Sequence, residues 1–228
     1  MNDLSSMALL QKEIGYEFKD EKYLKIALSH SSYANEAKLE KINNYERQEF
    51  LGDAVLELSV SDYIFKNYQT MPEGEMTKLR ASLVCEPTLA YIARKEIDLP
   101  KYILLGKGED NTGGRDRDSI ISDVFEALIG AIYLDGGLEP AVSFIKKYVL
   151  TDMESKIEFI DSKTRLQEKV QAVSKTLEYK LVSEEGPAHN KLYTSEVIID
   201  GEKMGIGSGK TKKSAEQHAA YEALKKLK

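Results

Sequence analysis

The hydrophobic periodicity of the sequence changes near residue 160, and this change limits the possible folds most. Up to residue 161, apolar residues recur at spacings of three and four, with breaks at Gly and Pro, which predicts consecutive helices. The rest predicts a helix over 164–174, three strands in LEYKLVSEE, KLYTSEVIID and EKMGIGSGK, and a helix over 212–226. We therefore predict an all-α domain at 1–155, a linker at 156–161 and a small α+β domain (α-β-β-β-α) at 162–228.

Charge divides the chain at the same place. The net charge of −6 alone argues against a nucleic-acid partner, because binding phosphates requires Lys and Arg. From Ser162 onward, however, 13 Lys and Arg stand against 9 Asp and Glu, a net of +4, which leaves −10 for the first 161 residues. The two parts therefore have different electrostatic roles.

Several features indicate the compartment. No apolar run approaches the roughly 20 residues that cross a bilayer, and the N-terminus lacks the pattern of a secretion signal. A single cysteine, Cys85, excludes an internal disulfide and fits a reducing environment. We expect a cytoplasmic protein with no membrane partner.

A row of carboxylates stands out in NYERQEFLGDAVLEL, residues 44–58. At about 100° per residue, four of them share one stripe of a helix beside Phe50: Glu46, Glu49, Asp53 and Glu57. Leu51, Val55 and Leu58 are expected on the far side, as in a central, largely buried helix. Carboxylates at these spacings repel one another and are costly to bury without partners, so either solvent or a cation must accompany them.

A second acidic pair, Asp123 and Glu126, has i,i+3 spacing in the strongly apolar segment ISDVFEALIGAIYLDGG. Oxygen ligands from two packed helices, with no His or Cys nearby in the sequence, suit Mg²⁺ or Mn²⁺ rather than zinc. The absence of a Glu-x-x-His pair disfavours a di-iron site. Just before this segment, GKGEDNTGGRDRDS at 106–119 is too polar and Gly-rich to pack, so we predict a mobile loop.

These segments carry a family resemblance. ERQEFLGDAVLEL and DVFEALIGAIYLD resemble the two signature segments of bacterial-type ribonuclease III, and the similarity extends through PEGEMTKLRASLV and LGKGE over essentially the whole chain. The resemblance implies a Mg²⁺-dependent endoribonuclease, with Mn²⁺ able to substitute, that hydrolyses double-stranded RNA to 5′-phosphate products. It also implies processing of ribosomal RNA precursors and of some mRNAs and tRNAs. Cutting both strands requires two sites related by a two-fold axis, so we expect a homodimer formed through apolar surface of the helical domain.

The resemblance assigns roles residue by residue. It implies that Asp53 and Glu126 are catalytic and that Glu49, Asp123 and Glu126 bind the metal. Three further acidic residues match positions of substrate positioning or added metal coordination: Glu46, Glu73 and Glu109.

Two positions depart from the family pattern, and neither removes a ligand. Tyr45 and Gln48 stand where the family commonly has Asn and Leu. Tyr45 could alter the contact of Glu46 with RNA or with the partner subunit. Glu57 matches no catalytic position, and a solvated or structural role is expected for it.

The C-terminal domain resembles a double-stranded-RNA-binding domain in KTRLQEKVQ, GPAHNKLYT and GIGSGKTKKSAEQHAAYEAL, in that order. Lys210, Lys212 and Lys213 stand at the start of its last helix, where the helix N-terminus also attracts phosphate. The resemblance assigns two further groups to successive minor grooves of RNA. These are Gln167, Glu168 and Gln171 in the first helix, and Pro187, Ala188 and His189 between strands.

Two other functions are compatible with parts of this pattern. A non-cleaving regulator that binds double-stranded RNA would have lost one or more of the four matched carboxylates, and all four are present. A helical metal-dependent scaffold that binds structured RNA would be distinguished by the lack of Mg²⁺-dependent cleavage.

Overall fold

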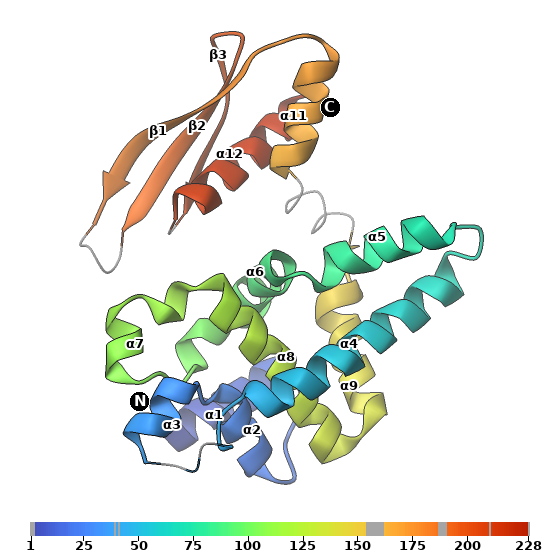
Figure 1. The fold of residues 1–228 in the computed structure, drawn as a ribbon, viewed down its shortest axis with the longest axis vertical. Coiled ribbons are helices and arrows are strands. Elements are labelled where there is room, and N and C mark those ends of the chain that lie inside the picture. The colour runs from blue at the N-terminus through green and yellow to red at the C-terminus, as the bar shows by residue number, and fades with distance from the viewer. Residues whose placement is uncertain are drawn as a thin grey trace. The chain divides into compact units, whose positions relative to one another are not determined.

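A computed structural model of the chain describes residues 3–38, 40, 42–153, 162–186, 191–209 and 211–227. The chain forms two compact units, Met1–Met153 and Glu154–Lys228 (Figure 1). The first is helical, and the second consists of a helix, three antiparallel strands and a helix, so the predicted fold class is confirmed. The linker predicted at 156–161 lies outside the described residues. No helix in the described part of the chain is long and apolar enough to cross a membrane.

The first unit is built around α8 (Asp118–Gly136), which is apolar on nearly every side and therefore buried. Phe125, Ile121 and Leu128 of α8 are fully buried. The helices of the first unit are α1 (Asp3–Ile14), α2 (Glu21–Leu28), α3 (Ser31–Glu36), α4 (Glu46–Asn67), α5 (Glu73–Val84), α6 (Glu86–Ile97), α7 (Lys107–Asn111), α8 (Asp118–Gly136) and α9 (Leu138–Ile145). Short turns of other helix types lie at η1 (Leu99–Tyr102), η2 (Gly114–Asp116) and η3 (Lys146–Leu150). Helices α2, α4, α6 and α9 all pack on α8.

Helix α4 is not the largely buried central helix that the sequence suggested. It packs most extensively on α8 and buries one stripe, which comprises Gln48, Gly52, Val55, Leu56, Ser59, Val60 and Ile64. Leu58, which was expected to face the core, is 60% exposed, and Phe50 and Phe65 are 81% and 71% exposed. The expectation for Leu58 was wrong because the helix is covered along one side only.

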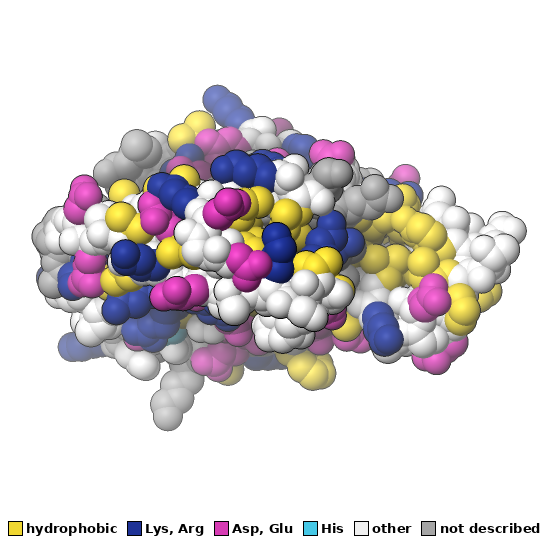
Figure 2. Space-filling model, turned by 90° about the horizontal axis from the view of Figure 1, so that it is seen from above, with side chains coloured by type: hydrophobic (Ala, Val, Ile, Leu, Met, Phe, Trp, Pro, Cys, Tyr) yellow, Lys and Arg dark blue, Asp and Glu magenta, His cyan; other side chains and the backbone are white. Residues whose placement is uncertain are grey.

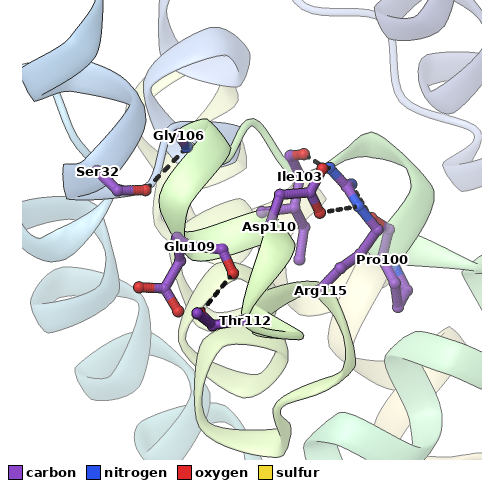
Figure 3. A network of polar contacts seen from close by, with 8 residues as sticks. All are labelled: Ser32, Pro100, Ile103, Gly106, Glu109, Asp110, Thr112 and Arg115. Carbon is purple, nitrogen blue, oxygen red and sulfur yellow. Dashed lines mark hydrogen bonds and ion pairs between the residues drawn. The ribbon is translucent and has the colours of Figure 1, made fainter. Parts of the chain in front are cut away.

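The polar segment 106–119 also differs from its prediction, because it forms α7 and η2 and packs (Figure 3). The Arg115 guanidinium donates to the carbonyl oxygens of Pro100 (2.6 Å) and Ile103 (2.9 Å) and to the Asp110 carboxylate (3.0 Å). The backbone N–H of Gly106 donates to Ser32 Oγ at 2.9 Å. Arg115, Asp110 and Gly106 thus form hydrogen bonds within the fold, so the expectation that this segment would not pack was wrong.

A tyrosine–carboxylate contact ties the segment before α2 to the end of α8. The Tyr16 hydroxyl donates to Asp135 Oδ2 at 2.6 Å, and the backbone N–H groups of Lys19 and Asp20 donate to the same carboxylate at 3.0 and 2.9 Å. Burial opposes the effect, but these hydrogen bonds hold the pKa of Asp135 below its usual value. The carboxylate therefore acts as a charged anchor for this connection.

The second unit has the predicted α-β-β-β-α order. Its elements are α11 (Ser162–Ala172), β1 (Leu177–Glu185), β2 (Leu192–Ile199), β3 (Glu202–Gly209) and α12 (Lys212–Lys226). The strands form an antiparallel sheet in the order β1-β2-β3, and both helices cover one of its faces (Figure 1). The core between the layers includes Leu166, Val197, Ala219 and Leu224. Helix α11 begins two residues earlier than predicted, whereas the bounds of β1 and α12 agree with the prediction.

Candidate functional site

Two glycines bring α4 and α8 into unusually close contact. A Cβ atom at Gly52 of α4 would lie 1.8 Å from the carbonyl oxygen of Glu126, and one at Gly130 of α8 would lie 2.2 Å from that of Gln48. Any larger residue would force the helices apart, although glycine inside a helix costs about 1 kcal/mol relative to alanine. Sequence reasoning did not identify this pair, and a glycine inside each apolar helix was the available signal.

The close crossing gathers three carboxylates from the two helices. Glu49 of α4 and Asp123 and Glu126 of α8 each offer an oxygen, and these oxygens lie within 4.8 Å of one another. All three side chains are partly buried. Within the described part of the chain, none of them forms an ion pair with Lys or Arg. Asp53, one turn after Glu49, is exposed and lies outside this group of three.

The electrostatics of the cluster favour protons or a cation. The pKa of Glu126 is raised to about 8, chiefly by burial and also by the negative charges of Asp53, Asp123 and Glu49. Burial likewise raises the pKa of Glu49 to about 7, with contributions from Asp123, Glu46 and Asp53. The pKa of Asp123 is also raised, chiefly by burial, and that of Asp53 is raised by partial desolvation and by the charge of Glu57. A bound cation would stabilise the ionised form of these carboxylates in their shared site.

The donor set fits a hard divalent ion. It consists of carboxylate oxygens alone, without the imidazole or thiolate ligands that zinc prefers. A cation there would neutralise the mutual repulsion that raises the pKa values of Glu49 and Glu126. The residues present therefore suit an ion such as Mg²⁺ or Mn²⁺.

The three other acidic positions lie outside this group, in different surroundings. Glu46 is exposed in the first turn of α4, and Glu73 is the exposed first residue of α5, where it accepts from Thr77 Oγ1 at 2.9 Å. Glu109 of α7 is more buried, and its Oε1 atom lies 2.8 Å from Arg117 Nη2 without hydrogen-bonding geometry. Only Glu46 among them contributes to the raised pKa of a cluster member, Glu49.

Tyr45, at the start of α4, approaches the cluster directly. Its hydroxyl donates to Asp123 Oδ2 at 3.3 Å, and its side chain is buried. The sequence drew attention to Tyr45 only through its neighbour Glu46, because Asp123 lies 78 positions away.

Gln48, the other departure from the family pattern, lies in the stripe of α4 that faces α8 and is 5% exposed. Its Oε1 atom has no hydrogen-bond partner in the described part of the chain. A buried acceptor without a partner costs about 1–3 kcal/mol. We expect Gln48→Leu to raise the free energy of unfolding by about 1 kcal/mol, measured by urea denaturation.

Gln11 provides the matched control, since it is 8% exposed but its Oε1 atom accepts from the Phe18 N–H at 2.8 Å. Gln11→Leu should therefore lower the free energy of unfolding. Equal losses in the two variants would show that the Gln48 carbonyl is hydrogen-bonded, for example to an ordered water.

The second unit presents a separate polar surface. Gln167, Glu168 and Gln171 are exposed on α11, and Lys212 and Lys213 are exposed in the first turn of α12. Thr211 caps α12 by accepting from the Ser214 N–H at 3.1 Å. The other predicted RNA-contacting residues, Pro187, Ala188, His189 and Lys210, lie outside the described residues.

Comparison with known families matches both units. Residues 20–153 match the model described as Ribonuclease-III-like, and residues 162–227 match the model described as the double-stranded RNA binding motif. Ribonuclease 3 of Listeria monocytogenes serotype 4a (strain HCC23) is 49% identical over 221 residues, covering 96% of each chain. Ribonuclease 3 of Bacillus cereus (strain AH820) is 51% identical over 223 residues, covering 96% of this chain and 91% of its own.

A solved structure resembles the first unit. The nuclease domain of ribonuclease III from Campylobacter jejuni has a TM-score of 0.57 and is 43% identical, covering 61% of this chain and 93% of its own. That structure is described as showing flexibility in a region involved in dimer formation.

Proposed function

Because this chain belongs to the ribonuclease III family, we propose that it hydrolyses double-stranded RNA with Mg²⁺ held by Glu49, Asp123 and Glu126. Mn²⁺ is proposed as a substitute. The observation that carries this proposal is the convergence of three partly buried carboxylates without a basic partner among the described residues. When bound, a divalent cation stabilises charge on the scissile phosphate and lowers the pKa of water.

The other acidic residues have proposed roles around this centre. We assign Asp53 a catalytic role with Glu126, since Asp53 is exposed to an incoming substrate and its charge contributes to the raised pKa of Glu126. Glu46, Glu73 and Glu109 are proposed to position the substrate. Glu46 is the best supported of these, because it lies in the same turn of α4 as Glu49.

The second unit is proposed to hold the RNA duplex. Lys212 and Lys213 lie at the N-terminus of α12, where their charges and the helix dipole both attract phosphate, and we add Lys210 to this group. Minor-groove contacts are proposed for Gln167, Glu168 and Gln171 on α11, together with Pro187, Ala188 and His189.

We propose a homodimer that forms through the exposed apolar stripe of α4, defined by Phe50, Leu58 and Phe65. Leu58 and Phe65 follow Phe50 by 8 and 15 positions, which at roughly 100° per residue places all three within about 80° of arc. Figure 2 shows hydrophobic side chains gathered at the surface toward the end where Figure 1 draws α5 and the last turns of α4. The carboxylates of α4 border this stripe, so a two-fold axis through it would relate two sites on one duplex.

The proposed substrates are ribosomal RNA precursors and some mRNAs and tRNAs, and the proposed compartment is the cytoplasm. The substrates are proposed from the resemblance to the ribonuclease III family, to which the chain belongs. The single cysteine suits a reducing compartment.

Cleavage of a long end-labelled RNA duplex and of a matched single strand, each with Mg²⁺, Mn²⁺ or EDTA, tests this function. We expect cutting of the duplex alone, with either metal, and no cutting in EDTA. Duplex binding should survive EDTA, because the only group of metal-ligating side chains found among the described residues lies in the first unit. Duplex binding without cutting in either metal would instead establish a non-cleaving RNA-binding regulator.

A further inference from the structure

Tyr45 makes a contact that the proposed metal centre does not yet explain. Its hydroxyl donates to Asp123 Oδ2 at 3.3 Å, although the two residues belong to different parts of the chain. Tyr45 is 5% exposed, so most of its side chain is removed from solvent. A buried tyrosine hydroxyl generally requires a hydrogen-bond acceptor, and Asp123 supplies one.

The position of this hydroxyl is fixed by the rest of the residue. The Tyr45 backbone N–H donates to the Ser29 carbonyl at 2.9 Å, and its own carbonyl accepts from the N–H groups of Gln48 (2.8 Å) and Glu49 (2.9 Å). Its ring lies 5.7 Å from the ring of His30, centroid to centroid. Because backbone and ring are both held, the hydroxyl presents a donor at a set place beside the cluster.

We propose that Tyr45 is a positioning residue, whose hydroxyl orients the Asp123 carboxylate toward Glu49 and Glu126 and so prepares the cluster for a divalent ion. This inference rests on the proposed metal centre. Without an ion the three carboxylates repel one another, so turning the Asp123 side chain toward solvent would lower the electrostatic free energy. A carboxylate has two oxygens, so one accepts from Tyr45 while the other remains available to a metal.

The expected consequence is a change in metal affinity. Removing a hydrogen bond to a metal-ligating side chain typically weakens metal binding by about 10–100-fold. We expect the lower end, because the Tyr45–Asp123 hydrogen bond is long. Duplex binding in EDTA should not change, since the residues proposed to hold the duplex in the second unit are left intact.

The test compares Mn²⁺ binding to the RNA-free full chain, by electron paramagnetic resonance of the free ion, for the unmodified protein, Tyr45→Phe and Tyr16→Phe. Tyr16→Phe is the matched control, because it also removes a tyrosine–aspartate hydrogen bond, of 2.6 Å to Asp135, within the first unit. We expect Tyr45→Phe to raise the Kd for Mn²⁺ about tenfold and Tyr16→Phe to lower Tm without changing this Kd. Cleavage by Tyr45→Phe should be slower at low Mg²⁺ and recover at saturating Mg²⁺, with the KM for duplex unchanged.

Equal Mn²⁺ affinity in the unmodified protein and Tyr45→Phe would overturn the positioning role, as would an equal loss of affinity in Tyr16→Phe. A different set of results would contradict the proposed metal centre itself. In that case the unmodified protein would bind no Mn²⁺, or its binding would be unaffected by Glu126→Gln, and the role of Tyr45 would fall with the centre.

Discussion

Glu126→Gln is expected to abolish cleavage of double-stranded RNA while duplex binding persists. The amide keeps the shape of the side chain but cannot carry the negative charge that a divalent ion requires. We expect a loss of at least about 10²–10⁴-fold in cleavage rate, the size of effect seen for a single acid–base group. The measurement is single-turnover cleavage of an end-labelled duplex, with binding measured in parallel in EDTA.

Glu57→Gln is the control for this experiment. Glu57 continues the acidic stripe of α4 but lies outside the three-carboxylate cluster and is exposed. Its neutralisation should leave cleavage close to that of the unmodified protein. Near-normal cleavage by Glu126→Gln would contradict the assignment of this residue.

Glu126→Gln should also stabilise the metal-free protein at high pH. The pKa of Glu126 is about 8 in the folded chain against an ordinary value of 4.5, so between these values the folded state binds more protons than the unfolded state. Its contribution to the free energy of unfolding is therefore fully present below pH 4.5 and is lost as the pH rises through 8. We expect Glu126→Gln to be more stable by about 2 kcal/mol at pH 8. This is less than the full pKa difference implies, because Glu126 is only partly buried and water screens its charge.

Urea unfolding in EDTA at pH 5 and pH 8 measures this effect. The difference between Glu126→Gln and the unmodified protein should be small at pH 5 and grow at pH 8. At pH 8, Mg²⁺ should raise the free energy of unfolding of the unmodified protein more than that of the variant. If the difference in the free energy of unfolding does not depend on pH, folding does not raise the pKa of Glu126.

Leu58→Asp and Phe65→Asp, made separately, should each convert the proposed homodimer to a monomer. Both side chains are exposed in the isolated chain, at 60% and 71%, and neither belongs to the carboxylate cluster. Hot-spot side chains contribute about 2–4 kcal/mol to an interface, and a two-fold interface contains each of them twice. The dissociation constant should therefore rise by roughly 10³-fold or more.

Light scattering coupled to size-exclusion chromatography measures the mass, and duplex cleavage measures the consequence. Leu9→Asp is the control, because Leu9 is a 40% exposed leucine on α1. It should leave the protein dimeric and active, whereas the two α4 variants should be monomeric and cut poorly. A mass unchanged by both α4 variants would place the interface elsewhere.

Much of this molecule follows from local pattern. Apolar spacing predicted the helical first unit and the α-β-β-β-α order of the second, because hydrophobic periodicity reflects the local geometry of each element. The candidate carboxylates were also local signals. Glu49 and Asp53 lie one turn apart on α4, Asp123 and Glu126 lie one turn apart on α8, and such spacing puts each pair on one side of its helix.

Local pattern did not predict which other segments surround a given helix or loop. Periodicity shows which residues of α4 share a side, but it does not show which sides another helix covers, and so Leu58 was assigned to the core. Composition showed that segment 106–119 is polar, but the partners of Arg115 lie as far back as Pro100.

The sequence by itself thus determined the elements, their order and the residue types available for chemistry, since these depend on neighbours within a few positions. Tertiary structure alone decided how Gly52 and Gly130 let two helix backbones meet, and how Tyr45 reaches Asp123. Both depend on packing between segments more than 70 residues apart, where side-chain volume and backbone approach, rather than local periodicity, set the distances.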